Sequence, residues 1–273
     1  MGFLRLRDAC SVGTTAWRLA LLAVVLASTA CSNSADPLTT ATGSEPADDG
    51  SAQVEVIDDN VGESAGGPGA YTVVAHADVP LIEAREAPEE GAAVVADVAN
   101  PLPSGSPLSF RVLPDGSESS AEWVEVMLPI QPNGSTGWIP RADVSLTDNP
   151  YRIEIDRASY SLRVYNLDEL WIESTVAIGT GDTPTPVGDF YLLELLQPPE
   201  PDGPYGPYAF GLSGFSEVLD TFGDSDTAII GLHGTNDPAA LGTDVSFGCI
   251  RLENEVIEEL AATLPLGTPV TIT

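Results

Sequence analysis

From Tyr71 to the C-terminus the sequence is a succession of short β-rich runs separated by Pro and Gly clusters, a pattern typical of small sheets. Ile153 and Ile155 alternate with charged residues, which predicts a strand with one buried face, and such strands usually form antiparallel sheets. Only residues 254–264 show a helical apolar stripe, with Asn254 as the expected N-cap. The sequence therefore predicts a mainly β fold with one C-terminal helix packed on the sheet.

Acidic side chains dominate the charge: there are 41 Asp and Glu residues against 10 basic residues, all of them arginine, and the formal net charge is −31. A protein of this charge repels phosphate backbones, which argues against nucleic-acid binding. The charge also argues against adhesion to anionic lipids. The favoured interpretation of this charge is solubility in a saline or acidic setting. The functional alternative is that an acidic cleft attracts a peptide that carries a free ammonium group.

One cysteine and one histidine lie together in the segment 229–252. Cys249 and His233 each adjoin a glycine, where a tight turn lets a substrate approach closely. A thiol needs a neighbouring base or cation to act as a nucleophile, and an imidazole can serve as that base. Two alternatives stay open: a structural role for both residues, and a metal site completed by Asp237 and Asp244.

The neighbours of Cys249 extend the candidate site. In an extended segment Arg251 shares a face with Cys249, where a guanidinium can hold a carboxylate through two hydrogen bonds. An ion pair between Arg251 and Glu253 is the structural alternative. The backbone N–H of Cys249, with that of Gly248 or Phe247, is the candidate oxyanion hole.

The run His233-Gly-Thr-Asn followed by Ser246-x-Gly-Cys-Ile-Arg resembles the signature of the YkuD-type L,D-transpeptidases. The resemblance covers residues 149–273 and implies a YkuD-type β-sandwich catalytic domain. Phe247 stands where the family usually has His, and Val256 where Asp is often found. The resemblance implies these roles: Cys249 as nucleophile, His233 as base, Ser246 as the residue that orients the histidine, Gly248 as the oxyanion-turn glycine, and Arg251, Gly234, Thr235, Phe247 and Tyr208 as substrate-binding residues.

The same resemblance implies an enzyme that uses no metal and no other cofactor. Its thiol would attack the third residue of a peptidoglycan tetrapeptide stem, release D-Ala and pass the acyl group to an amine or to water. Transfer to an amine cross-links the third residues of two stems. Inhibition by carbapenems is also implied.

Two rival functions remain possible at this point. One is a cysteine hydrolase, either an L,D-carboxypeptidase or an enzyme of the NlpC/P60 type. In the NlpC/P60 type the cysteine precedes the histidine, whereas here His233 comes first. The other is a wall-binding module whose catalytic site has decayed, and Phe247 is the one feature in its favour.

The N-terminal residues are expected to direct export. Residues 1–31 combine arginines, a short apolar run and Ser-Thr-Ala-Cys, which resembles a lipoprotein processing site with Cys31 lipidated. Ordinary signal cleavage is the alternative. Residues 32–69 lack Lys, Arg and aromatic residues and are predicted to be a disordered acidic linker. The protein is therefore expected at the outer face of the plasma membrane or in the cell wall, attached to the membrane only through lipid.

Residues 70–148 contain several β-rich runs and end near Gly137-Trp-Ile, which resembles the closing strand of bacterial SH3-like domains. A small SH3-like β-barrel is expected here, with an immunoglobulin-like sandwich as the alternative. His76 has no partner motif and is given no role. Farther on, the Pro-, Gly- and aromatic-rich residues 197–215 are expected to form a lid over the active site.

Overall fold

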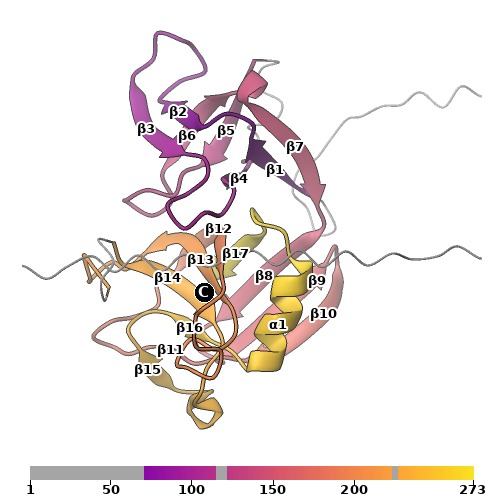
Figure 1. The fold of residues 1–273 in the computed structure, drawn as a ribbon, viewed down its shortest axis with the longest axis vertical. Coiled ribbons are helices and arrows are strands. Elements are labelled where there is room, and N and C mark those ends of the chain that lie inside the picture. The colour runs from indigo at the N-terminus through magenta and orange to yellow at the C-terminus, as the bar shows by residue number, and fades with distance from the viewer. Residues whose placement is uncertain (1–70, 115–121, 223–226) are drawn as a thin grey trace, which may run out of the picture. The chain divides into compact units, whose positions relative to one another are not determined.

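The computed structural model describes residues 71–114, 122–222 and 227–273, and all of them belong to one compact unit, Asp59–Thr273. This unit is mainly β with one α-helix, as the sequence predicts (Figure 1). Residues 1–31 with the predicted lipidation site Cys31, and the predicted linker 32–69, lie outside the described residues. Within the described ranges, no helix is long and apolar enough to cross a membrane.

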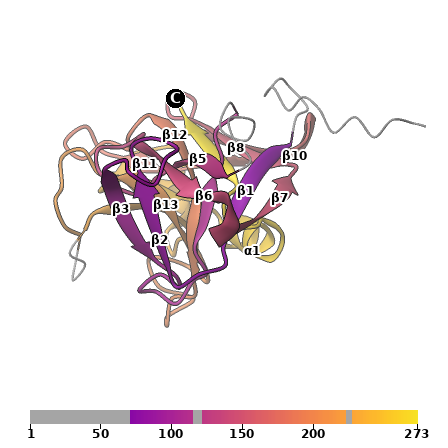
Figure 2. The ribbon, with the colours of Figure 1, turned by 90° about the horizontal axis from the view of Figure 1, so that it is seen from above.

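The N-terminal module consists of two small antiparallel sheets, ordered β4-β1-β7 and β3-β2-β6-β5, and a bridge between Val112 and Val126 links them. β1 lies beside β7, and β2 beside β3 (Figure 2). The SH3-like assignment stays a prediction. The strands are β1 (Thr72–Ala77), β2 (Leu81–Arg85), β3 (Val94–Ala99), β4 (Ser109–Arg111), β5 (Trp123–Met127), β6 (Thr136–Pro140) and β7 (Val144–Asn149), with a 3-10 turn, η1 (Arg141–Asp143), before β7.

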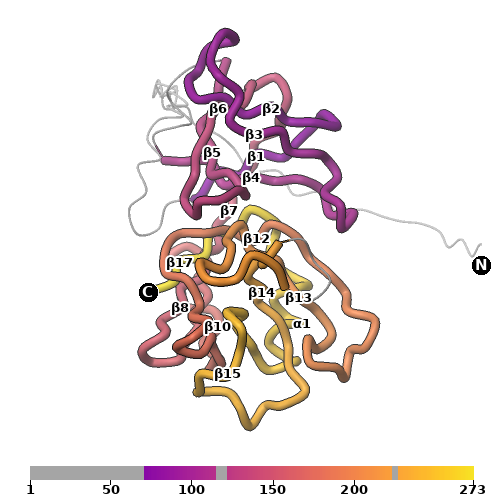
Figure 3. The backbone as a smooth tube through the Cα atoms, turned by 90° about the vertical axis from the view of Figure 1, so that its left-hand side faces the viewer, coloured from indigo at the N-terminus to yellow at the C-terminus, as the bar shows by residue number. Residues whose placement is uncertain are grey.

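A larger, eight-stranded sheet follows, ordered β10-β9-β8-β17-β12-β13-β14-β16. Strands β12, β13 and β14 lie side by side in it (Figure 3). A short parallel pair, β11 and β15, lies outside it. The elements are β8 (Tyr151–Asp156), β9 (Ser161–Asn166), β10 (Glu169–Thr175), β11 (Ile178–Gly179), β12 (Gly188–Leu196), β13 (Ala209–Phe215), β14 (Ile229–His233), η2 (Pro238–Ala240), β15 (Asp244–Ser246), β16 (Ile250–Arg251), α1 (Asn254–Thr263) and β17 (Pro269–Ile272).

The structure confirms the alternation predicted for β8. Ile153 and Ile155 are buried, and the charged residues that alternate with them are partly exposed. The expected antiparallel arrangement holds for most neighbouring strands of the large sheet, but two pairs differ. β17 runs parallel to β8, and β16 runs parallel to β14. Parallel neighbouring strands need a long connection. Here β9 to α1 lie in the sequence between β8 and β17, and η2 and β15 lie between β14 and β16.

Helix α1 packs its apolar side on the large sheet, and Ile257 and Leu260 are fully buried in the same cluster as Ile153. The predicted N-cap is wrong by one residue, since Glu253 occupies that position and makes no capping hydrogen bond through its side chain. Asn254 instead accepts a hydrogen bond from the backbone N–H of Thr235 at 2.8 Å. Its side chain therefore ties the helix to the segment that follows β14.

Strand β12 contributes to two cores at once, because successive side chains point to opposite faces of a strand. Phe190 and Leu192 belong to the core of the large sheet. Tyr191 and Leu193 belong to the core of the N-terminal module. Asn133 adds a paired contact, since its side-chain amide both accepts from the N–H and donates to the carbonyl of Phe215, at 2.9 Å each. The module is thus packed against the back of the strands that carry the candidate site.

The stretch expected to form a lid is only partly a loop. Residues 197–208 connect β12 to β13, but Ala209–Phe215 is strand β13 itself. Phe210 is fully buried in the core, so its aromatic ring is not part of a surface lid. The aromatic residue that the loop brings to the candidate site is Tyr205.

Candidate active site

Cys249 lies in a tight turn between β15 and β16. Gly248 before it has a φ of 116°, in the region that favours glycine. The Ser246 hydroxyl donates to the Cys249 carbonyl at 2.6 Å and accepts from the Gly248 N–H at 3.1 Å. The Thr185 hydroxyl donates to the Gly248 carbonyl at 2.9 Å. These bonds fix the direction in which the thiol points.

Two predicted roles change with this geometry. The Ser246 hydroxyl holds the cysteine turn and not the imidazole of His233. The Gly248 N–H is already engaged with Ser246, so it is not free to stabilise an oxyanion. Gly248 therefore contributes to the site through its backbone conformation and not as a donor to the oxyanion.

His233 is the last residue of β14, and 3% of its surface is exposed. Its Nδ1 lies 2.6 Å from the Gly234 carbonyl oxygen, which can only accept, so Nδ1 carries the proton. Nε2 is then the unprotonated nitrogen of the neutral ring. Burial lowers the pKa of His233 to about 4; the bond to Gly234 opposes this shift, and the charge of Arg251 adds to it.

The thiol and the imidazole both border the space above Gly231. A Cβ built on Gly231 would lie 3.5 Å from both Cys249 Sγ and His233 Cδ2. The Gly231 N–H also points to Sγ at 3.4 Å. Burial raises the pKa of the Cys249 thiol, while that N–H and the charge of Arg251 oppose the rise. With the thiol pKa raised and the imidazole pKa lowered, the resting pair is a neutral thiol beside a neutral base.

Arg251 pairs in register with His233 across β14 and β16. Its Nε is buried and has no hydrogen-bond partner in the described part of the chain. The ion pairs between described residues involve Arg85, Arg111, Arg152 and Arg163, and none of them includes Arg251. The expected alternative, a pair with Glu253, is therefore not formed, and the guanidinium keeps a free donor.

A cavity of about 600 Å³ opens over the thiol and the imidazole. Tyr205 covers His233, with ring centroids 4.9 Å apart and an interplanar angle of 57°. The sequence pointed to Tyr208 instead, but Tyr208 packs against the core of the large sheet. The cavity is lined by Ser104, Glu194, Leu195, Leu196, Gln197, Pro198, Pro199, Tyr205, Ala209, Phe210, Gly211, Phe222, Thr227, Ile229, Gly231, His233 and Cys249.

Four other predicted substrate-binding residues, Arg251 among them, lie outside the lining of this cavity. Phe247 is 61% exposed, and its ring centroid lies 6.2 Å from that of Phe222, a lining residue. Gly234 is packed against Gly206, and Thr235 is buried. Phe247 thus extends the aromatic edge of the cavity, whereas Gly234 and Thr235 support the loop beneath His233.

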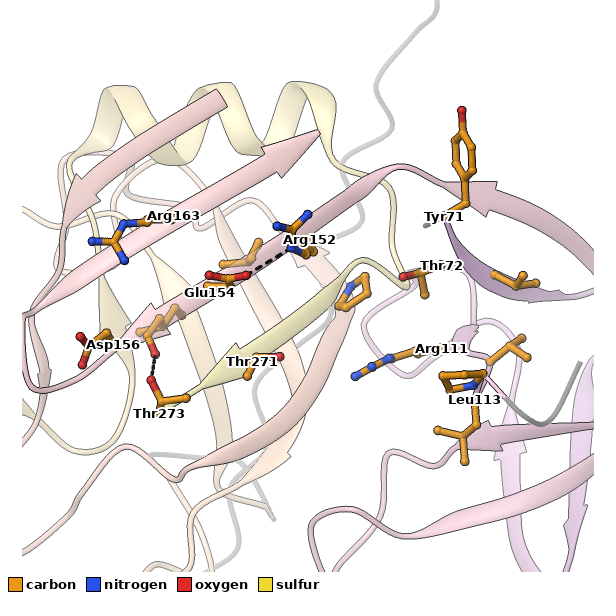
Figure 4. Close-up of a pocket in the computed structure, with 16 residues that line it drawn as sticks. Tyr71, Thr72, Arg111, Leu113, Arg152, Glu154, Asp156, Arg163, Thr271 and Thr273 are labelled. Atoms are coloured by element: carbon orange, nitrogen blue, oxygen red, sulfur yellow. Dashed lines mark hydrogen bonds and ion pairs between the residues drawn. The ribbon is translucent and has the colours of Figure 1, made fainter. Parts of the chain in front are cut away.

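A second cavity, of about 460 Å³, lies between β1 and β4 of the N-terminal module and β8 and β17 of the large sheet (Figure 4). Arg111 comes from the module side, and Arg152 pairs with Glu154 on the other side. Its lining holds neither Cys nor His. The chemistry available for acyl transfer is therefore in the cavity that contains Cys249.

His76, the other histidine, is structural. Its two ring nitrogens lie 2.9 Å from the Ser109 hydroxyl and 2.8 Å from the Thr147 hydroxyl, on the strands that flank β1. No group of three or more His, Cys, Asp or Glu side chains in residues 71–114, 122–222 and 227–273 is arranged to hold a metal ion.

Comparisons with known proteins match the part of the chain that contains Cys249 and His233. The YkuD family, described as an L,D-transpeptidase catalytic domain, matches residues 150–272. YqjB of Bacillus subtilis is 32% identical over 144 residues, which cover 49% of this chain and 77% of YqjB. The chain belongs to the YkuD L,D-transpeptidase family. This membership does not favour the NlpC/P60-type hydrolase or the decayed module that the sequence left possible.

YkuD of Bacillus licheniformis is 38% identical over 124 residues, and YkuD of Bacillus subtilis is 35% identical over 123. Both matches cover 45% of this chain, and the chain spans 66% of the length of either relative. Among solved structures, an L,D-transpeptidase of Mycobacterium tuberculosis H37Rv has a TM-score of 0.39 and 15% identity, covering 56% of this chain and 91% of that one. Bd1075 of Bdellovibrio bacteriovorus has a TM-score of 0.35 and 27% identity, covering 45% and 47%.

Proposed function

We propose that this protein is a peptidoglycan L,D-transpeptidase that works through a thioacyl-enzyme on Cys249. The observation that carries the proposal is that Cys249 Sγ and the His233 ring both lie 3.5 Å from one point above Gly231, beside a cavity in a YkuD-family chain. A nucleophile beside an oriented base is the arrangement that covalent acyl transfer requires. The substrate is a tetrapeptide stem, attacked at the carbonyl of its third residue.

The first half of the reaction forms the thioester. Nε2 of His233 takes the thiol proton as Sγ bonds to the carbonyl carbon, and the Cys249 N–H faces the developing oxyanion. The C–N bond to D-Ala then breaks, and His233 returns the proton to the leaving amine. Arg251, whose Nε has no hydrogen-bond partner among the described residues, holds a substrate carboxylate.

The second half resolves the thioester. An amine on a neighbouring stem loses a proton to His233 and attacks the acyl carbon, and the C–S bond breaks. The proton returns to the sulfur, so the thiol is regenerated and the two stems are joined. The Nε2 lone pair of His233 is free at any pH well above 4, and the lowered pKa means that the ring takes the thiol proton as the C–S bond forms and not in the resting enzyme.

Mass spectrometry of the purified protein tests the assignment. Incubation with a carbapenem or with a tetrapeptide donor should add one acyl group, and Cys249→Ala should take up none. His233→Ala should abolish acylation, whereas His76→Ala, in the structural histidine, should acylate as the wild type does. An unmodified wild-type protein, or equal losses from the two histidine changes, would refute the mechanism.

We also propose that the protein is exported and attached to the membrane through lipid on Cys31. The support is the arginine-flanked apolar run that ends in Ser-Thr-Ala-Cys. Labelling of cells with a clickable fatty acid tests it. The label should appear on the wild-type protein and vanish in Cys31→Ala, and equal labelling of the two would contradict lipidation at this residue.

A further inference from the structure

A row of three residues crosses the floor of the cavity. Glu194 on β12 is directly opposite Gly211 on β13, and Gly211 is directly opposite Gly231 on β14. Residues directly opposite each other in a sheet present their side chains on the same face. The Glu194 side chain therefore lies on the face of the sheet to which Cβ atoms on the two glycines would point. The Cys249 thiol lies over the same face, above Gly231.

The two glycines carry no side chains, so neighbouring side chains can lie over them. A Cβ on Gly211 would lie 2.7 Å from both Cγ and Oε1 of Glu194, so the carboxylate occupies the space above Gly211. Cys249 Sγ lies 3.5 Å from the equivalent point on Gly231. Since neighbouring strands are about 4.8 Å apart, a carboxylate and the thiol stand at the two ends of a short trough floored only by backbone.

The charge of the cavity lining makes this carboxylate distinctive. Glu194 is the one acidic residue among the lining residues, and no Lys or Arg is among them. Most of the remaining wall is aliphatic, aromatic or proline. No hydrogen bond or ion pair joins the Glu194 carboxylate to any other described residue. An anion beside apolar walls is stabilised when a cation arrives with the ligand.

We propose that Glu194 determines donor specificity by binding the side-chain ammonium of the residue whose carbonyl Cys249 attacks. This inference rests on the proposed function, and it assigns to Glu194 the recognition of the side chain of a diamino acid such as lysine at the third position. The flexible four-carbon stem of such a side chain spans the short gap between the thiol over Gly231 and the carboxylate over Gly211. Its ammonium then reaches Glu194 while its carbonyl stays at Sγ.

Peptide binding tests this role separately from catalysis. Two tetrapeptides, with lysine or uncharged norleucine at the third position, are titrated calorimetrically into the full chain carrying Cys249→Ala, which cannot turn over. The lysine peptide should bind about tenfold more tightly, the usual effect of one hydrogen bond to a charged group. Adding the isosteric change Glu194→Gln should remove that preference by weakening only the lysine peptide.

Glu258→Gln serves as the matched control. Glu258 is exposed on α1 and lines none of the cavities described above, yet this change alters the net charge by the same amount. It should leave the preference intact. Equal Kd values for the two peptides when Glu194 is present, or a preference that survives Glu194→Gln, would overturn the inference. Failure of the proposed function would appear elsewhere, as a wild-type protein that forms no thioester.

Discussion

The ring of Tyr205 lies against the imidazole of His233, with centroids 4.9 Å apart. Tyr205 thereby shields the ring from water, and desolvation is the largest cause of the lowered His233 pKa. We expect Tyr205→Ala to raise the pKa of His233 from about 4 towards its ordinary value of 6.5.

NMR titration can measure this shift, since the chain has only two histidines. Tyr205→Phe keeps the ring and should leave the His233 pKa nearly unchanged. If the pKa of His233 stays near 4 in Tyr205→Ala, the shielding comes from the rest of the cavity wall.

The stability of the protein should fall as the pH drops from about 6.5 to 4. In this window the unfolded chain binds a proton at His233, whereas the folded protein keeps the ring neutral down to about pH 4. The linkage corresponds to about 3 kcal/mol of unfolding free energy lost across the window. Urea unfolding at several pH values should show this slope, and His233→Gln should flatten it. Burial also lowers the pKa of His76, so His76→Gln should remove a further part of the same slope.

Ser246→Ala separates the two possible roles of this serine. The change removes the donor to the Cys249 carbonyl and leaves the buried Gly248 N–H without its acceptor. We expect a loss of about 1–3 kcal/mol in unfolding free energy and slower acylation, because the cysteine turn loosens. The His233 pKa should not move. A shifted His233 pKa in this variant would show that Ser246 acts on the imidazole after all.

Arg251→Lys tests whether the guanidinium holds substrate. A lysine keeps the charge but loses the forked geometry, and the lost charge-assisted bond should cost about 1.5–3 kcal/mol. This corresponds to a fall in kcat/KM for a stem peptide of about tenfold or more. Glu253→Gln is the control and should have no effect, because Glu253 forms no ion pair with Arg251 among the described residues. Turnover at the wild-type rate in Arg251→Lys would make Arg251 part of the scaffold only.

The sequence by itself determined the chemistry and the type of fold. Cys249 and His233 could be named because reactivity depends on residue type, and few residues of those types were available. The strand around Ile153 and Ile155 could be predicted because a two-residue alternation is a local property of one segment. The same holds for the stripe of helix α1.

Only the tertiary structure decided how the site is assembled. Tyr205, and not Tyr208, reaches His233, since a loop rich in Pro and Gly has no period from which a side-chain direction can be read. The contact of the histidine with the Gly234 carbonyl, and of Ser246 with Cys249, depends on backbone groups that every residue carries. Glu194 meets the row of Gly211 and Gly231 through strand register, which long-range pairing sets and no single segment encodes.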